Sequence, residues 1–206
     1  MLVKICGITR AEDAEAAAAA GASAIGFVFW PTSPRYIDPH RARTVAAMLP
    51  PFVTPVGGFV DQPLDYVNDV ASLVRLGAVQ LHGDETPEFA ASVSGPVIKA
   101  VSPGRADVGA WPPRVRLLLD VHDPVARGGT GRTIDWTAAA AISAQREIVL
   151  AGGLTPDNVA DAIARVRPFG IDVSSGVERI PGVKDHQRLR ALFEVVHGTC
   201  DAPARS

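Results

Sequence analysis

The chain has 206 residues, of which 47% are hydrophobic and 20% charged, with a formal net charge of −2. This composition supports one sizeable core and excludes a basic nucleic-acid-binding surface; no apolar run is long enough to span a membrane. The two cysteines lie at opposite ends of the chain and form no disulfide framework, and the N-terminus has no signal-peptide pattern. We therefore expect a cytoplasmic protein with one domain over residues 1–197 and a disordered tail over 198–206.

Short apolar segments alternate with longer helical patterns along the chain. Eight of them are predicted strands, at residues 2–6, 24–29, 54–60, 78–82, 96–101, 115–120, 147–151 and 170–174. They are apolar on successive residues, which is typical of parallel strands covered on both faces. Eight strand–helix units predict a compact α/β protein with the (β/α)8 TIM-barrel fold, and an open doubly wound sheet is the alternative.

Capping residues predict where the helices begin and end. Thr9 and Glu12 form a predicted capping box, and three pairs place a capping side chain before a proline: Asp38-Pro39, Thr86-Pro87 and Thr155-Pro156. Three glycines stand where a helix must end, namely Gly21, Gly77 and Gly170. The proline- and glycine-rich segment 102–114 leaves room for only about one turn of helix after the fifth strand.

Polar residues follow most of the predicted strands, at the end of the barrel where active sites of this fold lie. They are Cys6, Arg35 in the loop 31–35, Asp61, His82, Lys99, Asp120, Gly152-Gly153 and Ser174-Ser175-Gly176. The two clusters of small residues follow strands seven and eight, the recurrent phosphate site of the fold. Their alternative role is to form tight turns.

Four side chains at this end each allow two interpretations. Cys6 is either an inert packed thiol or, when ionised, a base or nucleophile. Asp120 is either a general acid whose pKa is raised by its apolar strand or a cap of the following loop. His82 is either a proton shuttle or a histidine hydrogen-bonded into the rim, and Arg35 binds a carboxylate or phosphate unless it is a solvated surface arginine.

Two further patterns are rejected. The segment Gly128-Gly129-Thr130-Gly131 resembles a dinucleotide-binding loop only superficially, because no strand leads directly into it. No His, Cys or carboxylate pair has the spacing of a metal site.

Several segments, spread over residues 4–185, together resemble the phosphoribosylanthranilate isomerase family. They are Lys4-Ile5-Cys6-Gly7-Ile8-Thr9, Gly26-Phe27-Val28-Phe29, Ser33-Pro34-Arg35, Val79–Glu85, Gly128–Gly131, Asp135-Trp136, Ala151-Gly152-Gly153-Leu154, Asp172–Glu178, Pro181-Gly182 and Lys184-Asp185. They occur in the order of the family and cover nearly the whole chain, so the resemblance is specific.

The resemblance implies a (β/α)8 enzyme of tryptophan biosynthesis. Its reaction is the Amadori rearrangement of N-(5'-phosphoribosyl)anthranilate to 1-(2-carboxyphenylamino)-1-deoxyribulose 5-phosphate, with no cofactor or metal. Cys6 is then expected to be the general base and Asp120 the general acid. Substrate contacts are expected from Arg35, which would hold the anthranilate carboxylate, and from His82, Asp172, Gly152, Gly153, Ser174, Ser175 and Gly176. The phosphorylated substrate is a small molecule, and the family includes monomers and homodimers.

Three positions depart from the family pattern: Gly58 replaces a larger apolar residue, Ile134 a phenylalanine, and Asp61 a common asparagine. Two alternative functions are a related phosphosugar isomerase of histidine biosynthesis and a non-catalytic barrel that binds phosphorylated metabolites. The histidine-pathway family uses an aspartate at the position of Cys6, and the intact set of Cys6, Asp120 and Arg35 argues against the non-catalytic barrel.

Overall fold

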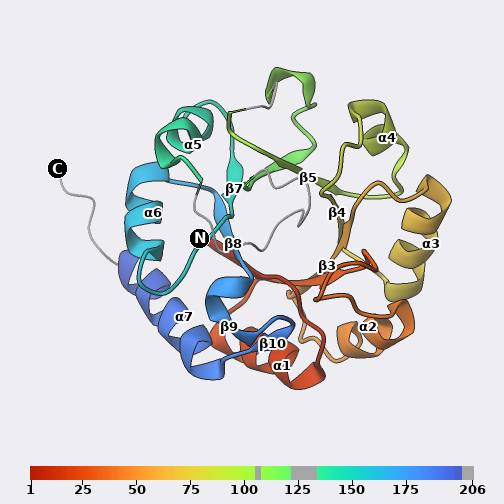
Figure 1. The fold of residues 1–206 in the computed structure, drawn as a ribbon, viewed down its shortest axis with the longest axis horizontal. Helices are drawn as coiled ribbons and strands as arrows, with labels where there is room; N and C mark the ends of the chain where they lie inside the picture. The colour runs from red at the N-terminus through yellow and green to blue at the C-terminus, as the bar shows by residue number, and fades with distance from the viewer. Residues whose placement is uncertain (105–107, 122–133, 201–206) are drawn as a thin grey trace.

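The computed structural model describes residues 1–104, 108–121 and 134–200 of the protein. Eight parallel strands form a closed barrel in which each strand pairs with the next and β8 pairs with β1. Helices surround the strands on all sides (Figure 1). The predicted (β/α)8 barrel is confirmed, and the alternative of an open sheet is wrong.

The barrel strands lie where the apolar segments predicted them. They are β1 (Leu2–Ile5), β2 (Ala24–Val28), β3 (Thr54–Phe59), β4 (Ala78–Leu81), β5 (Val97–Val101), β6 (Arg116–Leu119), β7 (Ile148–Leu150) and β8 (Gly170–Val173). All except β5 end one residue earlier than predicted. The next residue nevertheless donates its backbone N–H to the neighbouring strand at Cys6, His82 and Asp120, with N···O distances of 2.9, 2.8 and 3.0 Å. The barrel ladder therefore holds the backbone of these three residues.

In the part of the chain that the structure describes, seven α-helices cover the barrel: α1 (Ala11–Ala20), α2 (Pro39–Ala46), α3 (Leu64–Val74), α4 (Pro87–Ser92), α5 (Trp136–Ser143), α6 (Val159–Val166) and α7 (His186–Cys200). Between β5 and β6 the only helix among the described residues is the 3-10 helix η1 (Val108–Ala110), which confirms the shortened fifth helix. In Figure 1 the loop with η1 lies between α4 and α5.

Helix α7 continues past residue 197 to Cys200, and residues 201–206 lie outside the described residues. Within the described ranges, no helix has the length and hydropathy needed to cross a membrane.

Three of the predicted helix boundaries are confirmed. The Asp38 side chain accepts hydrogen bonds from the N–H groups of His40 and Arg41 at 2.9 and 3.3 Å, and Thr86 accepts one from Phe89. Gly21 ends α1 in the left-handed conformation, with φ of 110°.

The other boundary predictions are wrong because the residues have different partners. Thr9 donates its hydroxyl to the carbonyl of Gly182, so α1 begins after Arg10 without a side-chain cap. Helix α6 begins after Asn158 and not at Thr155-Pro156. Left-handed arginines, Arg75 and Arg167, end α3 and α6. Gly77 and Gly170 instead allow close packing against the adjacent strands. A Cβ on Gly77 would collide with Thr54, and a Cβ on Gly170 would collide with the Leu2 carbonyl.

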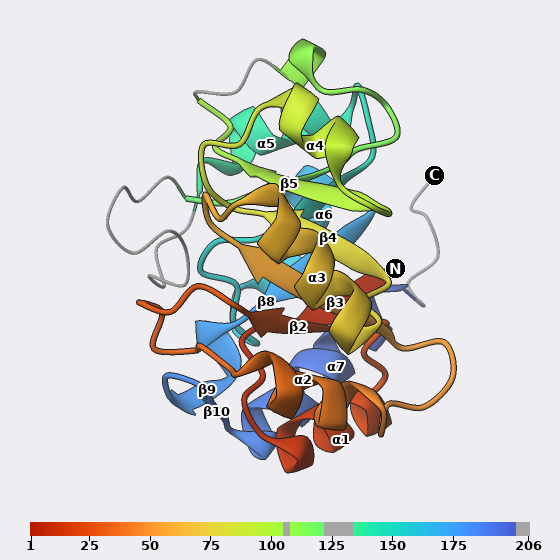
Figure 2. The same ribbon diagram turned by 90° about the vertical axis from the view of Figure 1, so that its right-hand side faces the viewer.

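A short antiparallel hairpin follows β8 and was not predicted. The 3-10 helix η2 (Ser175–Val177) leads into β9 (Glu178–Ile180), which pairs with β10 (Val183–Lys184). In Figure 2 this hairpin and the amino terminus lie on opposite sides of the molecule. The hairpin therefore stands near the end of the barrel where the strands finish, and β10 leads directly into α7.

The interior of the barrel is apolar on one side and polar on the other. A small cluster of Ala100, Leu118, Val149 and Ala151 fills the part next to β5, β6 and β7. Lys4, Gln80 and Asp172 are buried on β1, β4 and β8. Because side chains of a strand alternate between its faces, Cys6, His82, Asp120 and Ser174 point the same way as the side chains two residues before them. The barrel thus directs all four toward its carboxyl-terminal mouth.

Candidate active site

Cys6 is a half-buried thiol directly after β1. A Cβ on Gly26 of the neighbouring strand would lie 2.9 Å from the Cys6 Sγ and 3.1 Å from the Lys4 Cε. The absence of a side chain at Gly26 therefore leaves the space in which the thiol and the Lys4 stem lie together. Burial raises the pKa of Cys6 above its ordinary value, and the positive charge of Lys4 opposes that rise.

Lys4 and Asp172 form a buried ion pair beside this thiol. Their side chains are adjacent in the β1–β8 register, and Lys4 Nζ lies 2.9 Å from Asp172 Oδ2. Burial disfavours the charged lysine, but the charges of Asp172 and Cys6 raise the pKa of Lys4 above its ordinary value. The other oxygen of this buried carboxylate, Oδ1, has no hydrogen-bond partner among the described residues.

Asp120 and His82 are brought together at the ends of β6 and β4. Asp120 Oδ1 accepts a hydrogen bond from the Val121 N–H at 2.7 Å, and Oδ2 lies 3.4 Å from His82 Nε2. The other ring nitrogen, Nδ1, lies 3.1 Å from the amide nitrogen of Gln80. The roles in this contact depend on the tautomer: with the Gln80 amide nitrogen as the donor, Nδ1 accepts and the proton of a neutral His82 lies on Nε2, facing Asp120. Asp120 thus caps its loop and also contacts His82, and the sequence did not indicate this second contact.

The two small-residue clusters lie side by side. Gly152 and Gly153 have φ of 84° and 64°, a region that glycine adopts without strain. A Cβ on Gly176 would collide with the carbonyl of Leu154, so the loops after β7 and β8 are in contact. A Cβ on Gly152 would lie 3.1 Å from Asp120 Oδ1, and the Ser174 hydroxyl donates to the Cys6 carbonyl at 3.2 Å. The joined loops therefore extend from Asp120 to Cys6.

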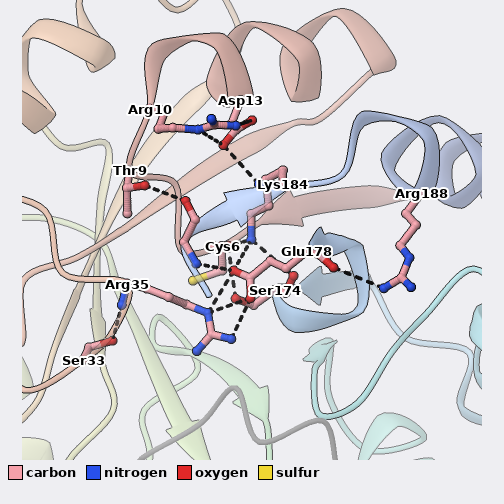
Figure 3. A network of polar contacts seen from close by, with 11 residues as sticks. Cys6, Thr9, Arg10, Asp13, Ser33, Arg35, Ser174, Glu178, Lys184 and Arg188 are labelled. Atoms are coloured by element: carbon pink, nitrogen blue, oxygen red, sulfur yellow. Dashed lines mark hydrogen bonds and ion pairs between the residues drawn. The ribbon is translucent and has the colours of Figure 1, made fainter. Parts of the chain in front are cut away.

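Arg35 is buried, so its interpretation as a solvated surface arginine is wrong. Its Nε and Nη2 atoms donate to the Glu178 carboxylate of β9, with the shortest contact at 2.7 Å. Glu178 also accepts a hydrogen bond from Lys184 Nζ at 2.9 Å. Lys184 in turn donates to the carbonyls of Cys6 and Ser174 at 2.6 and 3.2 Å (Figure 3). Arg35 and Cys6 are thus parts of one polar network.

Sequence reasoning did not assign a role to four residues of these networks: Lys4, Gln80, Glu178 and Lys184. The alternation of side chains could have found the first two, since they precede Cys6 and His82 by two positions. Glu178 and Lys184 lie in segments that carried the family resemblance. Pairing of β9 with β10 places them opposite each other, and Glu178 contacts Arg35.

Lys99 and Asp61 belong to a separate cluster. Lys99 lies within β5, and its ammonium donates to the Gly83 carbonyl and to Glu85 at 2.5 and 2.8 Å. Glu85 also accepts from the backbone N–H of Asp61 at 2.9 Å. This cluster joins the loops after β3 and β4. The Gly128–Gly131 segment lies outside the described residues.

Comparison with known proteins identifies the family. The family model described as N-(5'phosphoribosyl)anthranilate (PRA) isomerase matches residues 3–195. The chain belongs to the phosphoribosylanthranilate isomerase family.

The relatives of the chain resemble it over nearly their full length. The N-(5'-phosphoribosyl)anthranilate isomerase of Geobacter sulfurreducens is 50% identical over 201 residues, which cover 95% of this chain and 98% of that protein. A crystal structure of phosphoribosyl anthranilate isomerase in complex with reduced 1-(o-carboxyphenylamino)-1-deoxyribulose 5-phosphate has a TM-score of 0.84 and 44% identity. It covers 96% of this chain and 100% of that one. A structure of monomers of the dimeric Thermotoga maritima enzyme has the same TM-score and coverage at 42% identity.

Membership in the phosphoribosylanthranilate isomerase family makes the chain an isomerase with a TIM-barrel fold. The departures from the family pattern at Gly58 and Ile134 do not disturb the site. Gly58 has space beside it, with only the Phe27 carbonyl at 3.4 Å from an added Cβ, and Ile134 packs against Gly152.

Proposed function

We propose that the chain catalyses the rearrangement of N-(5'-phosphoribosyl)anthranilate in tryptophan biosynthesis by general acid–base catalysis. One observation carries the proposal. Cys6, Asp120, Arg35 and the two glycine loops, which are scattered along the chain, all lie at the carboxyl-terminal end of one barrel. This arrangement supports an acid and a base on opposite sides of a substrate that is anchored at both of its charged ends.

In this mechanism Asp120 donates a proton to the ribose ring oxygen, and the ring opens to an iminium ion. The iminium acidifies the C2' hydrogen, which the Cys6 thiolate removes to give an enolamine that tautomerises to the ketone. A proton on His82 Nε2 would stabilise Asp120 once it has become a carboxylate, because the two groups are 3.4 Å apart. Lys4 would stabilise the Cys6 thiolate in the same way.

The charged ends of the substrate have separate binding groups. The phosphate is proposed to bind backbone N–H groups of the joined loops after β7 and β8, which carry Gly152, Gly153 and Gly176. The Ser175 hydroxyl is a further donor for the phosphate. The anthranilate carboxylate is proposed to bind Arg35, and Asp172 Oδ1 would accept a hydrogen bond from a substrate hydroxyl.

All of these groups come from one chain, so the proposed site is complete in a monomer and in a homodimer. The charge and composition support a cytoplasmic enzyme whose partner is this small phosphorylated molecule, without nucleic acid or membrane. Light scattering during gel filtration measures the oligomeric state directly.

The test is a fluorescence assay that follows the loss of phosphoribosylanthranilate with purified protein. We expect turnover by the wild-type chain and a kcat at least about 100-fold lower for Cys6→Ala, the low end of the contribution from general base catalysis. Cys200→Ser is the matched control, because Cys200 lies at the end of α7. Absence of wild-type turnover contradicts the proposed function, and near-normal turnover of Cys6→Ala removes the thiol from the mechanism.

A further inference from the structure

The binding of Arg35 by Glu178 determines which part of the guanidinium remains for a ligand. A guanidinium has five N–H donors in a fixed plane. Glu178 occupies the side edge, since Nε lies 2.9 and 3.2 Å from its two oxygens and Nη2 lies 2.7 Å from one of them. The end edge, formed by Nη1 and the second N–H of Nη2, has no partner among the described residues. Figure 3 shows this end of Arg35 pointing away from Glu178 and Lys184.

The position of Glu178 is itself constrained. Its side chain is 4% exposed, and it accepts from Lys184 Nζ and from the Gly182 N–H at 2.9 and 3.2 Å. Burial alone would raise the pKa of Glu178, but hydrogen bonds and charge from Arg35 and Lys184 hold it below its ordinary value. Glu178 is therefore an ionised carboxylate held in one position by Lys184 and Gly182, and it orients the Arg35 guanidinium.

The stem of Arg35 is constrained from the other side. Gly7 has φ of 74°, and a Cβ there would lie 2.5 Å from the Arg35 Cδ and 3.1 Å from the Ser174 Oγ. The stem thus crosses the turn directly after Cys6. Lys184, whose side chain is fully buried, connects this turn to Glu178 through the Cys6 carbonyl.

With the Cys6 thiol protonated, the buried ion pairs of the network leave one positive charge uncompensated. Lys4 is paired with Asp172, whereas Arg35 and Lys184 share the single negative charge of Glu178. An anionic ligand group at the end edge of Arg35 would balance the charges of these ion pairs. A second carboxylate fits this edge, because it too accepts two parallel N–H bonds.

We propose that Glu178 is a positioning residue that sets the specificity for a substrate with a ring carboxylate, by holding the side edge of Arg35 so that the end edge faces the ligand. This inference rests on the proposed function, in which Arg35 binds that carboxylate. Glu178 does not touch the substrate, and its effect depends entirely on Arg35.

The experiment compares two ligands by calorimetry. One is reduced 1-(o-carboxyphenylamino)-1-deoxyribulose 5-phosphate, and the other is the same molecule without the ring carboxylate. The measured quantity is the ratio of their Kd values, which expresses the preference for the carboxylate.

We expect the wild-type chain to prefer the first ligand and Arg35→Ala to lose the preference. Glu178→Gln should reduce it about tenfold, the effect of losing a well-oriented charge-assisted contact. In the Arg35→Ala background, Glu178→Gln should have no further effect on the ratio.

Two more variants separate positioning from folding. Glu178→Asp keeps the negative charge between the two cations but withdraws the carboxylate by one methylene group, so it should fold and still reduce the preference. Glu85→Gln is the matched control, because it breaks a buried ion pair of similar length, 2.8 Å to Lys99, in the other polar cluster. It should leave the ratio unchanged. In the wild-type protein, the Arg35 Nε–H should exchange slowly with solvent by NMR before any ligand is added.

The outcomes distinguish the two proposals. If Arg35→Ala retains the preference, the carboxylate clamp of the proposed function and this inference both fail. If Arg35→Ala loses it while Glu178→Gln and Glu178→Asp retain it, only the role of Glu178 fails. Equal weakening of both ligands by the Glu178 variants, or a rapidly exchanging Nε–H, also overturns the role of Glu178.

Discussion

Two buried polar clusters lie at the carboxyl-terminal end of this barrel, and they differ in what their cations contact. In the first, next to β1 and β8, Lys184 donates to the backbone of Cys6, and Arg35 keeps one edge available for a ligand. In the second, next to β4 and β5, Lys99 donates to the Gly83 carbonyl and to Glu85. The first cluster joins candidate catalytic groups, whereas the second joins loops.

The difference shows that burial and charge do not by themselves identify a functional residue. Lys99 and Lys184 are both nearly inaccessible and both paired with a glutamate about 2.9 Å away or less. What separates them is the neighbour: a loop carbonyl for Lys99, and the carbonyl of the proposed base for Lys184. Variants in and near each cluster should therefore affect different measurements.

The largest effect on activity is expected at Asp120. Asp120→Asn keeps the shape of the side chain but removes the transferable proton, so kcat should fall at least about 100-fold. Asp135→Asn is the control: Asp135 caps α5 by accepting from the N–H groups of Thr137 and Ala138, and asparagine caps a helix equally well. Steady-state kinetics measure both. Turnover of Asp120→Asn near that of the wild type would assign the proton donation elsewhere.

The second cluster should govern stability instead of turnover. Glu85→Gln leaves Lys99 buried without its counter-charge, which should lower the free energy of unfolding by about 3 kcal/mol. At temperatures where the variant is folded, kcat should stay within about twofold of the wild type, because chemistry changes only when the transition-state contacts change. Urea unfolding and kinetics give the two values.

Glu147→Gln provides the comparison for Glu85→Gln, because the Glu147–Arg116 pair is exposed to solvent. An exposed pair contributes about 1 kcal/mol or less. A large loss of kcat in Glu85→Gln at full folding would contradict the assignment of this cluster to loop structure.

A smaller and pH-dependent effect is expected at Lys4. Its positive charge opposes the rise that burial causes in the pKa of Cys6, so Lys4→Met should raise that pKa further. A base acts only when deprotonated, and its activity increases as the pH rises through its pKa. The rising limb of the pH–rate profile should therefore move to higher pH, with a greater loss of activity at neutral than at alkaline pH.

Alkylation of the thiol offers an independent measurement for Lys4→Met. In a Cys200→Ser background, the rate of reaction of Cys6 with iodoacetamide reports the thiolate fraction, and its pH dependence should shift in the same direction. An unshifted profile in both measurements would show that Lys4 does not act on the thiol.

Much of the fold could be predicted because strands buried on both faces leave a strong local pattern. The apolar segments located all eight strands, and the prolines and glycines of 102–114 indicated the shortened helix. Helix boundaries were predicted less well. Thr9 and Asn158 are bonded to partners that depend on the hairpin and on loop geometry, and Arg75 and Arg167 adopt the left-handed conformation where glycine was expected.

By itself, the sequence determined that this is a (β/α)8 barrel of a recognisable family with Cys6, Asp120, Arg35 and the glycine loops at one end. Strand order and alternation follow from local patterns, so these positions could be assigned without coordinates. Only the tertiary structure decided which side chains meet: Arg35 with Glu178, Lys184 with the Cys6 carbonyl, and His82 with Asp120. Such contacts join residues far apart in the chain, and their distances depend on how the loops and the β9–β10 hairpin pack, for which no local pattern exists.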